Sequence, residues 1–168
     1  EKNAAAVAEL KGMGVDADSV TVNITDRGSC EAMVAKTVER FGRVDCLVNN
    51  AGTSIRKQPE EYELEEWDQV LDTNLRSAFV CSRLVYPHMK AQGGGKIIMI
   101  GSMMSIFGAP YSSPYASSKG AIVQLGKSLA IAWAKDNIQV NTILPGWIDT
   151  AMTQRAREQV DGLHEHVE

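Results

Sequence analysis

Tyr115 and Lys119 form a pair of side chains suited to proton transfer. They lie four residues apart in the stretch YASSK, after Ser113 and Pro114, residue types that are typical of a helix start. Side chains with this spacing share one face of a helix. A neighbouring ammonium stabilises a phenolate and lowers the pKa of a phenol from about 10. The pair is therefore a candidate acid/base for interconverting an alcohol and a carbonyl, although alone it also fits a half-buried tyrosine beside a solvated lysine.

Ser102 and Asn74 are the next candidates for chemistry. Ser102 ends the apolar run KIIMIGS (96–102), thirteen residues before Tyr115, so its hydroxyl could bind a substrate oxygen beside the phenol. Asn74 lies inside an expected helix, in LDTNLRSAF, where its amide competes for backbone groups. Taken singly, Ser102 also fits a turn or cap, and Asn74 also fits a local kink of its helix.

The elements that must position these side chains alternate along the chain. A helix is expected up to about Gly12, followed by three more at 27–41, 64–92 and 114–135. Expected strands are 19–24, 44–48, 96–102 and 138–146. Apolar strands separated by helices predict an α/β fold, a doubly wound parallel sheet with helices on both faces. Ligands of such sheets bind beyond the carboxyl ends of the strands, so the site is expected there.

Composition excludes several classes of protein. The 168 residues carry a formal net charge of -4 and 44% hydrophobic residues, which is typical of one ordinary globular domain. No basic stripe indicates nucleic acid, and no long apolar run indicates a membrane span. Three scattered cysteines without metal-ligand spacing predict buried thiols in a reducing cytoplasm. His164 and His166 near the end of the chain are expected to lie in a solvated tail, so no metal site is predicted.

Five motifs together resemble the short-chain dehydrogenase/reductase superfamily. They are NNAG (49–52), Asn74, Ser102, YASSK (115–119) and PGWIDT (145–150), in the family's order and spacing from about residue 1 to about residue 155. The resemblance implies a Rossmann-like fold. It also implies an NAD- or NADP-dependent oxidoreductase that transfers a hydride between nicotinamide and a secondary alcohol or ketone.

The resemblance assigns roles to the four polar residues. It implies that Tyr115 is the acid/base and that Lys119 lowers its pKa and holds the hydroxyls of the nicotinamide ribose. It implies that Ser102 orients the substrate carbonyl. Asn74 would kink its helix and hold a water that links Lys119 to solvent.

The resemblance also implies a set of cofactor-binding residues. Besides Tyr115 and Lys119, the implied residues are Asn23, Ile24, Asn49, Ala51, Gly52, Pro145, Gly146, Ile148 and Thr150. Asn23 stands where the family usually has an aspartate that accepts a bond from the adenine amino group. The choice between NAD and NADP is left open, because the strand that decides it in the family has no counterpart here.

Substrate and assembly are also implied by the resemblance. AGTSIRK and SMMSIFG resemble the branch that oxidises sugar acids and polyols, such as gluconate and deoxygluconate. Arg56 and Lys57 form a basic pair that could bind a carboxylate, with Met104 and Trp147 lining the pocket; the alternative is a solvated loop with two exposed cations. The helices at about 64–92 and 114–135 are expected to join subunits into a homodimer or homotetramer.

The largest departure from the family is that its Gly-rich phosphate-binding turn is missing. No Gly-rich phosphate-binding turn occurs in the sequence, so residues 1–168 are expected to form a single, incomplete domain. We expect it to lack the first two strands and the C-terminal strand of the family and to bind dinucleotide poorly or not at all, so that this chain alone could be inactive. Either the missing part exists outside this sequence, or strand 19–24 pairs directly with 44–48, or the N-terminal quarter detaches. The alternative function is a truncated or non-enzymatic relative that keeps the fold but does not bind dinucleotide; a serine hydrolase is disfavoured, because no GxSxG motif is present.

Overall fold

The computed structural model describes residues 2–150 and 153–154. Its α-helices are α1 (Lys2–Gly12), α2 (Arg27–Phe41), α3 (Leu64–Leu71), α4 (Ser77–Ala91) and α5 (Ser113–Trp133). Its strands are β1 (Cys46–Asn49), β2 (Gly95–Ile100) and β3 (Ile138–Ile143). No helix within the described ranges is long and apolar enough to cross a membrane.

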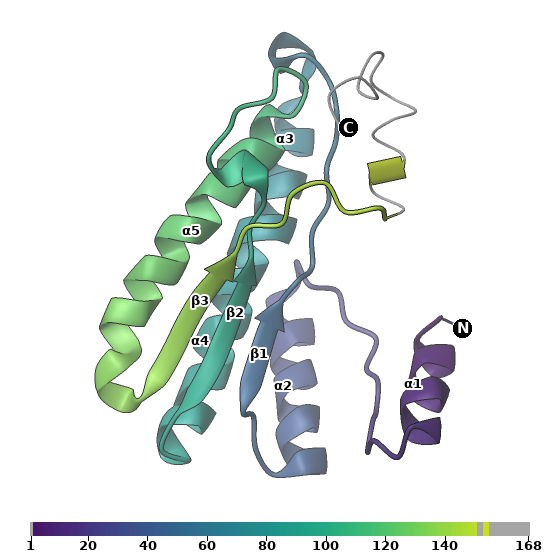
Figure 1. Cartoon of the computed structure of the whole chain (residues 1–168), viewed down its shortest axis with the longest axis vertical. Helices are drawn as coiled ribbons and strands as arrows, with labels where there is room; N and C mark the ends of the chain where they lie inside the picture. The colour runs from purple at the N-terminus through teal and green to yellow at the C-terminus, as the bar shows by residue number, and fades with distance from the viewer. Residues whose placement is uncertain (1, 151–152, 155–168) are drawn as a thin grey trace.

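The three strands form one parallel sheet in the order β1-β2-β3. Leu47, Ile97 and Val140 stand side by side in its register. Each crossover between neighbouring strands contains a helix, as parallel pairing requires. In Figure 1 all three arrows point the same way, toward the end where the loops of the candidate site gather. The predicted parallel α/β fold is therefore confirmed.

The hydrophobic core lies between the sheet and the helices α2, α4 and α5. Ile97 and Met99 on β2 are fully buried, together with Met89 of α4 and Ile122 of α5. Alternate strand residues point away from these helices because side chains of a strand alternate between its faces. On that second face Cys46, Val48 and Ile143 are exposed. Within the described part of the chain, helices therefore cover one face of the sheet rather than both.

The burial of the cysteines reflects the same difference between the helix-covered side of the sheet and its open face. Cys30 and Cys81 are buried between α2 and α4, as expected, but Cys46 is exposed. Its strand β1 is an edge of the sheet that the described residues form, and Cys46 lies on the face that these helices leave open. The expectation that all three thiols are buried is therefore wrong for Cys46.

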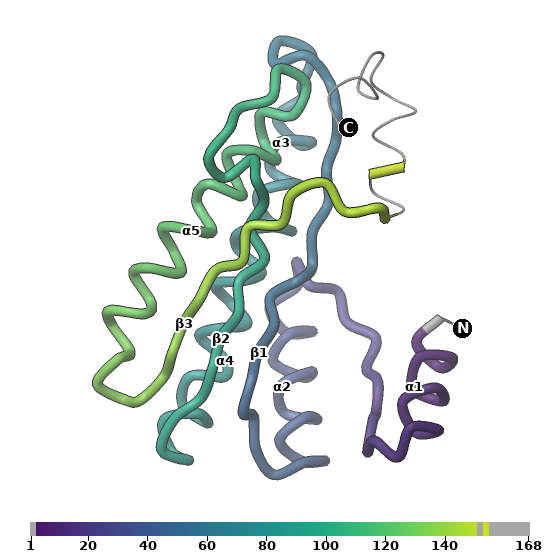
Figure 2. Tube along the Cα trace, in the orientation of Figure 1, coloured from purple at the N-terminus to yellow at the C-terminus, as the bar shows by residue number. Residues whose placement is uncertain are grey.

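The expected strand 19–24 is wrong as well. This segment pairs with no strand, and β1 has only β2 as a neighbour in the described sheet. It runs as an extended connection between α1 and α2 and does not continue the sheet beside β1 (Figure 2). Its contacts are made with α2 instead, where the Sγ of Cys30 donates to the carbonyl of Ile24 at 3.4 Å. β-branched residues favour extended backbone, but a strand needs a pairing partner, and direct pairing with β1 does not occur.

The expected helix 64–92 is interrupted where Asn74 stands. A π-helical turn, Asp72–Arg76, separates α3 from α4. Single π-helical turns inside helices often occur at functional sites. The expected helix 114–135 corresponds to α5 followed by a 3-10 turn, Ala134–Asp136.

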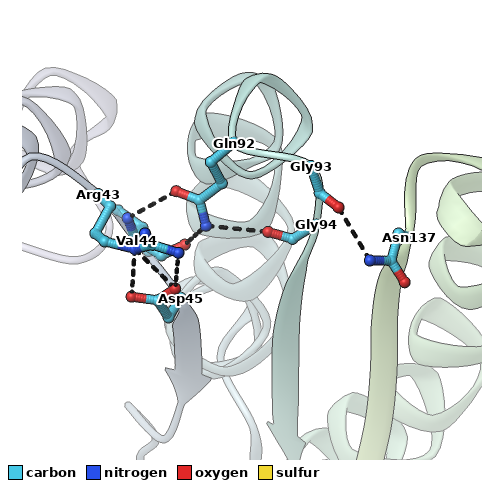
Figure 3. Close-up of polar contacts among 7 residues, drawn as sticks. All are labelled: Arg43, Val44, Asp45, Gln92, Gly93, Gly94 and Asn137. Carbon is cyan, nitrogen blue, oxygen red and sulfur yellow. Dashed lines mark hydrogen bonds and ion pairs between the residues drawn. The ribbon is translucent and has the colours of Figure 1, made fainter.

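Side-chain amides hold the strand ends together on the side opposite the site (Figure 3). Gln92, after α4, donates from Nε2 to the carbonyls of Val44 at 2.7 Å and Gly94 at 3.0 Å, and its Oε1 accepts from the Val44 amide at 3.3 Å. Asn137 before β3 donates to the carbonyl of Gly93 at 2.9 Å. These bonds connect the starts of β1, β2 and β3, and so help to fix the register that aligns their other ends.

Candidate active site

The four polar residues singled out from the sequence come together at the carboxyl ends of the strands. Ser102 follows β2, Tyr115 and Lys119 lie in the first turns of α5, and Asn74 lies in the π-helical turn. Ser102, Lys119 and Asn74 are buried, with 8%, 4% and 2% of their surfaces exposed. Tyr115 is half-buried and lines a pocket together with Ser102.

Lys119 has a buried ammonium beside the tyrosine ring. Its Nζ lies 5.6 Å from the centroid of the Tyr115 ring and donates to the carbonyl of Ile100 at 2.7 Å. Removal from water disfavours the charged form, so burial lowers the pKa of Lys119 to about 8. A positive charge is therefore still available next to the phenol at neutral pH.

Ser102 is oriented by the turn that follows β2. Its Oγ accepts a hydrogen bond from the amide of Met104 at 3.1 Å, which leaves the hydroxyl proton for another acceptor. The amide of Ser102 donates to the Oγ of Ser105 at 3.2 Å, and Ser105 donates in turn to the carbonyl of Lys119 at 2.7 Å. Ser105 therefore connects the turn of Ser102 to the helix that carries Tyr115 and Lys119.

Asn74 connects α5 to the loop after NNAG. Its Oδ1 accepts from the amide of Thr53 at 2.8 Å, and its Nδ2 donates to the Thr53 carbonyl and to the Oγ of Ser118, both at 3.0 Å. Ser118 donates to the carbonyl of Tyr115 at 2.7 Å. A Cβ added to Gly52 would lie 3.5 Å from Asn74 Oδ1 and 3.7 Å from Lys119 Nζ. The end of NNAG therefore adjoins the cluster; the water expected on Asn74 stays a prediction.

A separate pocket lies beside the edge of β1. Three of the expected cofactor residues, Ile24, Asn49 and Ala51, are among its lining residues. The side chain of Asn49 turns toward α4 and donates to the Oγ of Ser82 at 3.0 Å. Asn23 does not line this pocket, and its Oδ1 accepts from the amide and hydroxyl of Thr25 at 3.2 and 2.9 Å. Asn23 is thus engaged in a local turn before α2.

The motif PGWIDT continues from β3 toward Ser102. The carbonyl of Pro145 accepts from the amide of Met103 at 2.8 Å, and Gly146 lines the same pocket as Ser102. Further along, the Oγ1 of Thr153 donates to the carbonyl of Ile148 at 2.6 Å and lies 3.3 Å from the Oγ1 of Thr150. Gly146 therefore adjoins the cluster, whereas Ile148 and Thr150 belong to the next turn.

Three of the residues expected to contact a substrate, Arg56, Met104 and Trp147, line the pocket at Tyr115. Tyr111, in the loop before α5, lines it too. Sequence reasoning missed Ser54, Ser112 and Thr153 as lining residues. The position of Ser54 just after NNAG could have indicated that it lies near the site. No sequence pattern indicates the same for Ser112 or Thr153.

The basic pair Arg56 and Lys57 is divided between two environments. Lys57 places its Nζ 2.6 and 2.7 Å from the carboxylate oxygens of Glu66 on α3, away from the substrate pocket. Arg56 lines the pocket instead, and partial burial lowers the pKa of its guanidinium. Of the two cations, Arg56 is therefore the one placed to meet a ligand in the pocket.

Within the described ranges, His, Cys, Asp and Glu side chains form no group of three able to hold a metal ion. His164 and His166 lie outside the described residues.

A parallel sheet whose carboxyl-end loops hold Ser102, Asn74 and Lys119 around Tyr115 defines a Rossmann-type α/β protein with its polar site at the strand ends. The chain belongs to the short-chain dehydrogenase family, whose sequence pattern, described as "short chain dehydrogenase", matches residues 1–161. The resemblance seen in the sequence is thereby confirmed.

Individual relatives cover most of the chain. The 3-oxoacyl-(acyl-carrier-protein) reductase of Thermotoga maritima is 36% identical over 153 residues, 91% of this chain and 62% of that protein. The 2-dehydro-3-deoxy-D-gluconate 5-dehydrogenase of Pseudoalteromonas atlantica is 39% identical over 150 residues, 89% of this chain and 59% of that protein. The chain thus spans less than two thirds of the length of these relatives.

Among solved structures, a gluconate 5-dehydrogenase from Burkholderia cenocepacia J2315 in complex with NADP and tartrate superposes with a TM-score of 0.88 at 32% identity. The match covers 96% of this chain and 62% of that chain. The described elements therefore keep the arrangement of a larger dehydrogenase.

Proposed function

We propose that this protein is an oxidoreductase that uses NAD or NADP to interconvert a secondary alcohol and a ketone. The observation that carries the proposal is the shared pocket of Ser102 and Tyr115, with the ammonium of Lys119 buried 5.6 Å from the tyrosine ring. A purely structural role would not need a hydroxyl, a phenol and a buried cation at one pocket. The competing function, a relative that keeps the fold without binding dinucleotide, is favoured by no contact in the site.

Each residue of the cluster has a part in the proposed reaction. In the oxidative direction Tyr115, as the phenolate, accepts the hydroxyl proton of the substrate, and the positive charge of Lys119 stabilises that phenolate. Ser102 donates its free hydroxyl proton to the substrate oxygen and holds it beside Tyr115. Asn74 fixes the loop after NNAG against α5 through Thr53 and Ser118. A nicotinamide held beside Pro145 and Gly146 would supply the acceptor for the hydride of the substrate carbon.

The residues present suit one half of a dinucleotide. The pocket with Ile24, Asn49 and Ala51 and the close approach of Gly52 to Lys119 fit an adenosine and a ribose on either side of NNAG. Pro145 and Gly146, beside Ser102, fit the nicotinamide end. No Gly-rich turn in the sequence supplies the pyrophosphate contacts, so poor or absent dinucleotide binding by this chain stays our prediction.

A sugar acid or polyol is the proposed substrate class. Arg56 lines the pocket, and a guanidinium is well matched to a carboxylate. Met104 and Trp147 supply apolar walls around it. The sugar-acid names of two of the similar proteins support the same class.

The test is a dehydrogenase assay on the 168-residue chain at millimolar cofactor. Sugar acids and their ketones are paired with NAD or NADP in both oxidation states, and reduced nicotinamide is followed by absorbance. Tyr115→Phe is expected to lower kcat by about a hundredfold or more, because the acid/base is lost. Tyr86→Phe, which removes a hydroxyl bonded to Asp136 away from the pocket, is the matched control. An unchanged rate in Tyr115→Phe would contradict the proposal. No turnover of any pair by the unaltered chain would favour the alternative function, a relative that keeps the fold but does not bind dinucleotide.

A further inference from the structure

Two loops that are distant in sequence form adjoining walls of the substrate pocket. One contributes Ser54 and Arg56 after NNAG, and the other contributes Tyr111 and Ser112 before α5. Their hydroxyls meet where the Oγ atoms of Ser54 and Ser112 lie 3.5 Å apart. The position of Arg56 relative to Tyr111 therefore depends on whatever holds these loops to each other.

Tyr62 holds both loops through its hydroxyl. Its Oη donates to the carbonyl of Ile55 at 2.7 Å, lies 3.2 Å from the carbonyl of Tyr111, and accepts from the amide of Lys57 at 3.3 Å. Ile55 and Lys57 flank Arg56 in the sequence, so the Tyr62 hydroxyl is bonded to the backbone on both sides of Arg56; we call this set of bonds the bracket. The amide of Lys57 also lies 3.1 Å from the carbonyl of Tyr111, which closes the connection.

The bracket is anchored to α3. Lys57 pairs through Nζ with the carboxylate of Glu66, and the same carboxylate accepts from the amide of Glu63 at 3.1 Å. Partial burial raises the pKa of Tyr62, so its phenol stays protonated and able to donate at neutral pH. Tyr62 itself is absent from the lining of the pocket, and its hydrogen bonds reach the pocket through the backbone of the two loops.

We propose that Tyr62 is a positioning residue for substrate selectivity: by bracketing Arg56 and binding the Tyr111 loop, it sets where the guanidinium meets a substrate carboxylate. The inference rests on the proposed function, since it assumes that Arg56 binds a sugar acid. It predicts that loss of the Tyr62 hydroxyl weakens binding of carboxylates and leaves neutral polyols unaffected.

D-gluconate and D-glucitol are matched probes, because one carries a carboxylate where the other carries a CH2OH group. Binding of each to the full chain is measured by calorimetry for the unaltered protein, Tyr62→Phe, Arg56→Ala and Tyr86→Phe. We expect Tyr62→Phe to weaken gluconate binding by about fivefold, the equivalent of one net hydrogen bond, with glucitol binding unchanged. Arg56→Ala is expected to abolish the preference for gluconate, and Tyr86→Phe to leave both affinities as they are.

The possible results distinguish failure of the proposed substrate class from failure of the proposed role of Tyr62. An unaltered chain that does not prefer gluconate over glucitol removes sugar acids from the proposed substrate class, and with them the carboxylate that Arg56 is proposed to bind. A chain that prefers gluconate, with Tyr62→Phe indistinguishable from it, overturns the role of Tyr62 alone. Equal weakening of both ligands, or loss of the cooperative unfolding transition in Tyr62→Phe, also overturns it, because the residue would then hold the fold rather than the position of Arg56.

Discussion

Lys119 is the residue whose environment is most unusual in this protein. Its ammonium is buried, bonded to the carbonyl of Ile100 and close to the Tyr115 ring. An uncompensated buried charge destabilises the folded state, and a functional site is a common reason for keeping one. The charge that is proposed to stabilise the Tyr115 phenolate therefore has a measurable effect on stability.

That effect predicts a pH dependence of unfolding. The folded pKa of Lys119, about 8, lies below its ordinary value of 10.5, so burial of the charge is fully unfavourable below pH 8. As the pH rises from 8 toward 10.5 the folded state releases this proton first, and stability increases. Relative to Lys119→Met, the free energy of unfolding should rise by on the order of 3 kcal/mol over this window. Urea unfolding of both chains at several pH values measures it; a constant difference would contradict the prediction.

At the scale of elements, the crossover from α4 into β2 depends on backbone that only glycine adopts easily. Gly93 and Gly94 have φ values of 89° and 146°. A Cβ on Gly94 would lie 2.6 Å from both the carbonyl oxygen and the side-chain nitrogen of Asn137, whereas one on Gly93 would meet nothing within 4 Å. Gly93 and Gly94 therefore share a positive φ, but only at Gly94 would an added Cβ collide with Asn137.

This difference predicts unequal effects of two alanine substitutions. Gly93→Ala should lower the free energy of unfolding by about 1 kcal/mol through backbone strain alone. Gly94→Ala should lower it by about 1–3 kcal/mol more, because the added methyl must displace Asn137 and the start of β3. Chemical denaturation of the two variants tests this. Equal losses would show that the contact with Asn137 is relaxed without penalty.

The whole molecule leaves apolar side chains in solvent on the two helices expected to join subunits. Phe79 of α4 is 44% exposed and Ile131 of α5 is 82% exposed. Isolated exposed apolar residues are common, so these two do not by themselves establish an interface. Substitutions at these two positions can nevertheless test whether the proposed homodimer or homotetramer forms through α4 and α5.

Light scattering on the purified chain should therefore report a mass of two or four subunits. Ile131→Glu is expected to shift that mass toward the monomer, because a carboxylate would be desolvated at the contact. Val48→Glu is the matched control, since Val48 is exposed on the open face of the sheet rather than on α4 or α5. A monomeric unaltered chain, or an equal shift in both variants, would contradict assembly through these helices.

Local signals in the sequence predicted the elements and much of the candidate site. Aspartate is a residue type that favours helix starts, and Asp26 caps α2, its carboxylate accepting from the amide of Ser29 at 2.6 Å. Glycine favours helix ends, and Gly42 adopts φ 76° at the end of the same helix. The four-residue spacing of Tyr115 and Lys119 needed only a helix to bring them together. Such features are readable because capping and helical spacing act between residues close in sequence.

Tertiary structure alone decided the features that depend on distant partners. The β-branched segment 19–24 forms no strand, because pairing requires a neighbouring strand and none adjoins it in the described sheet. Arg56 and Lys57, adjacent and alike in sequence, diverge because Glu66 on α3 pairs with only one of them. Tyr62 acquires its place from carbonyls of Ile55 and Tyr111 that a linear pattern does not bring together. The sequence by itself thus determined which residues can do chemistry, and packing between distant segments decided which of them share a pocket.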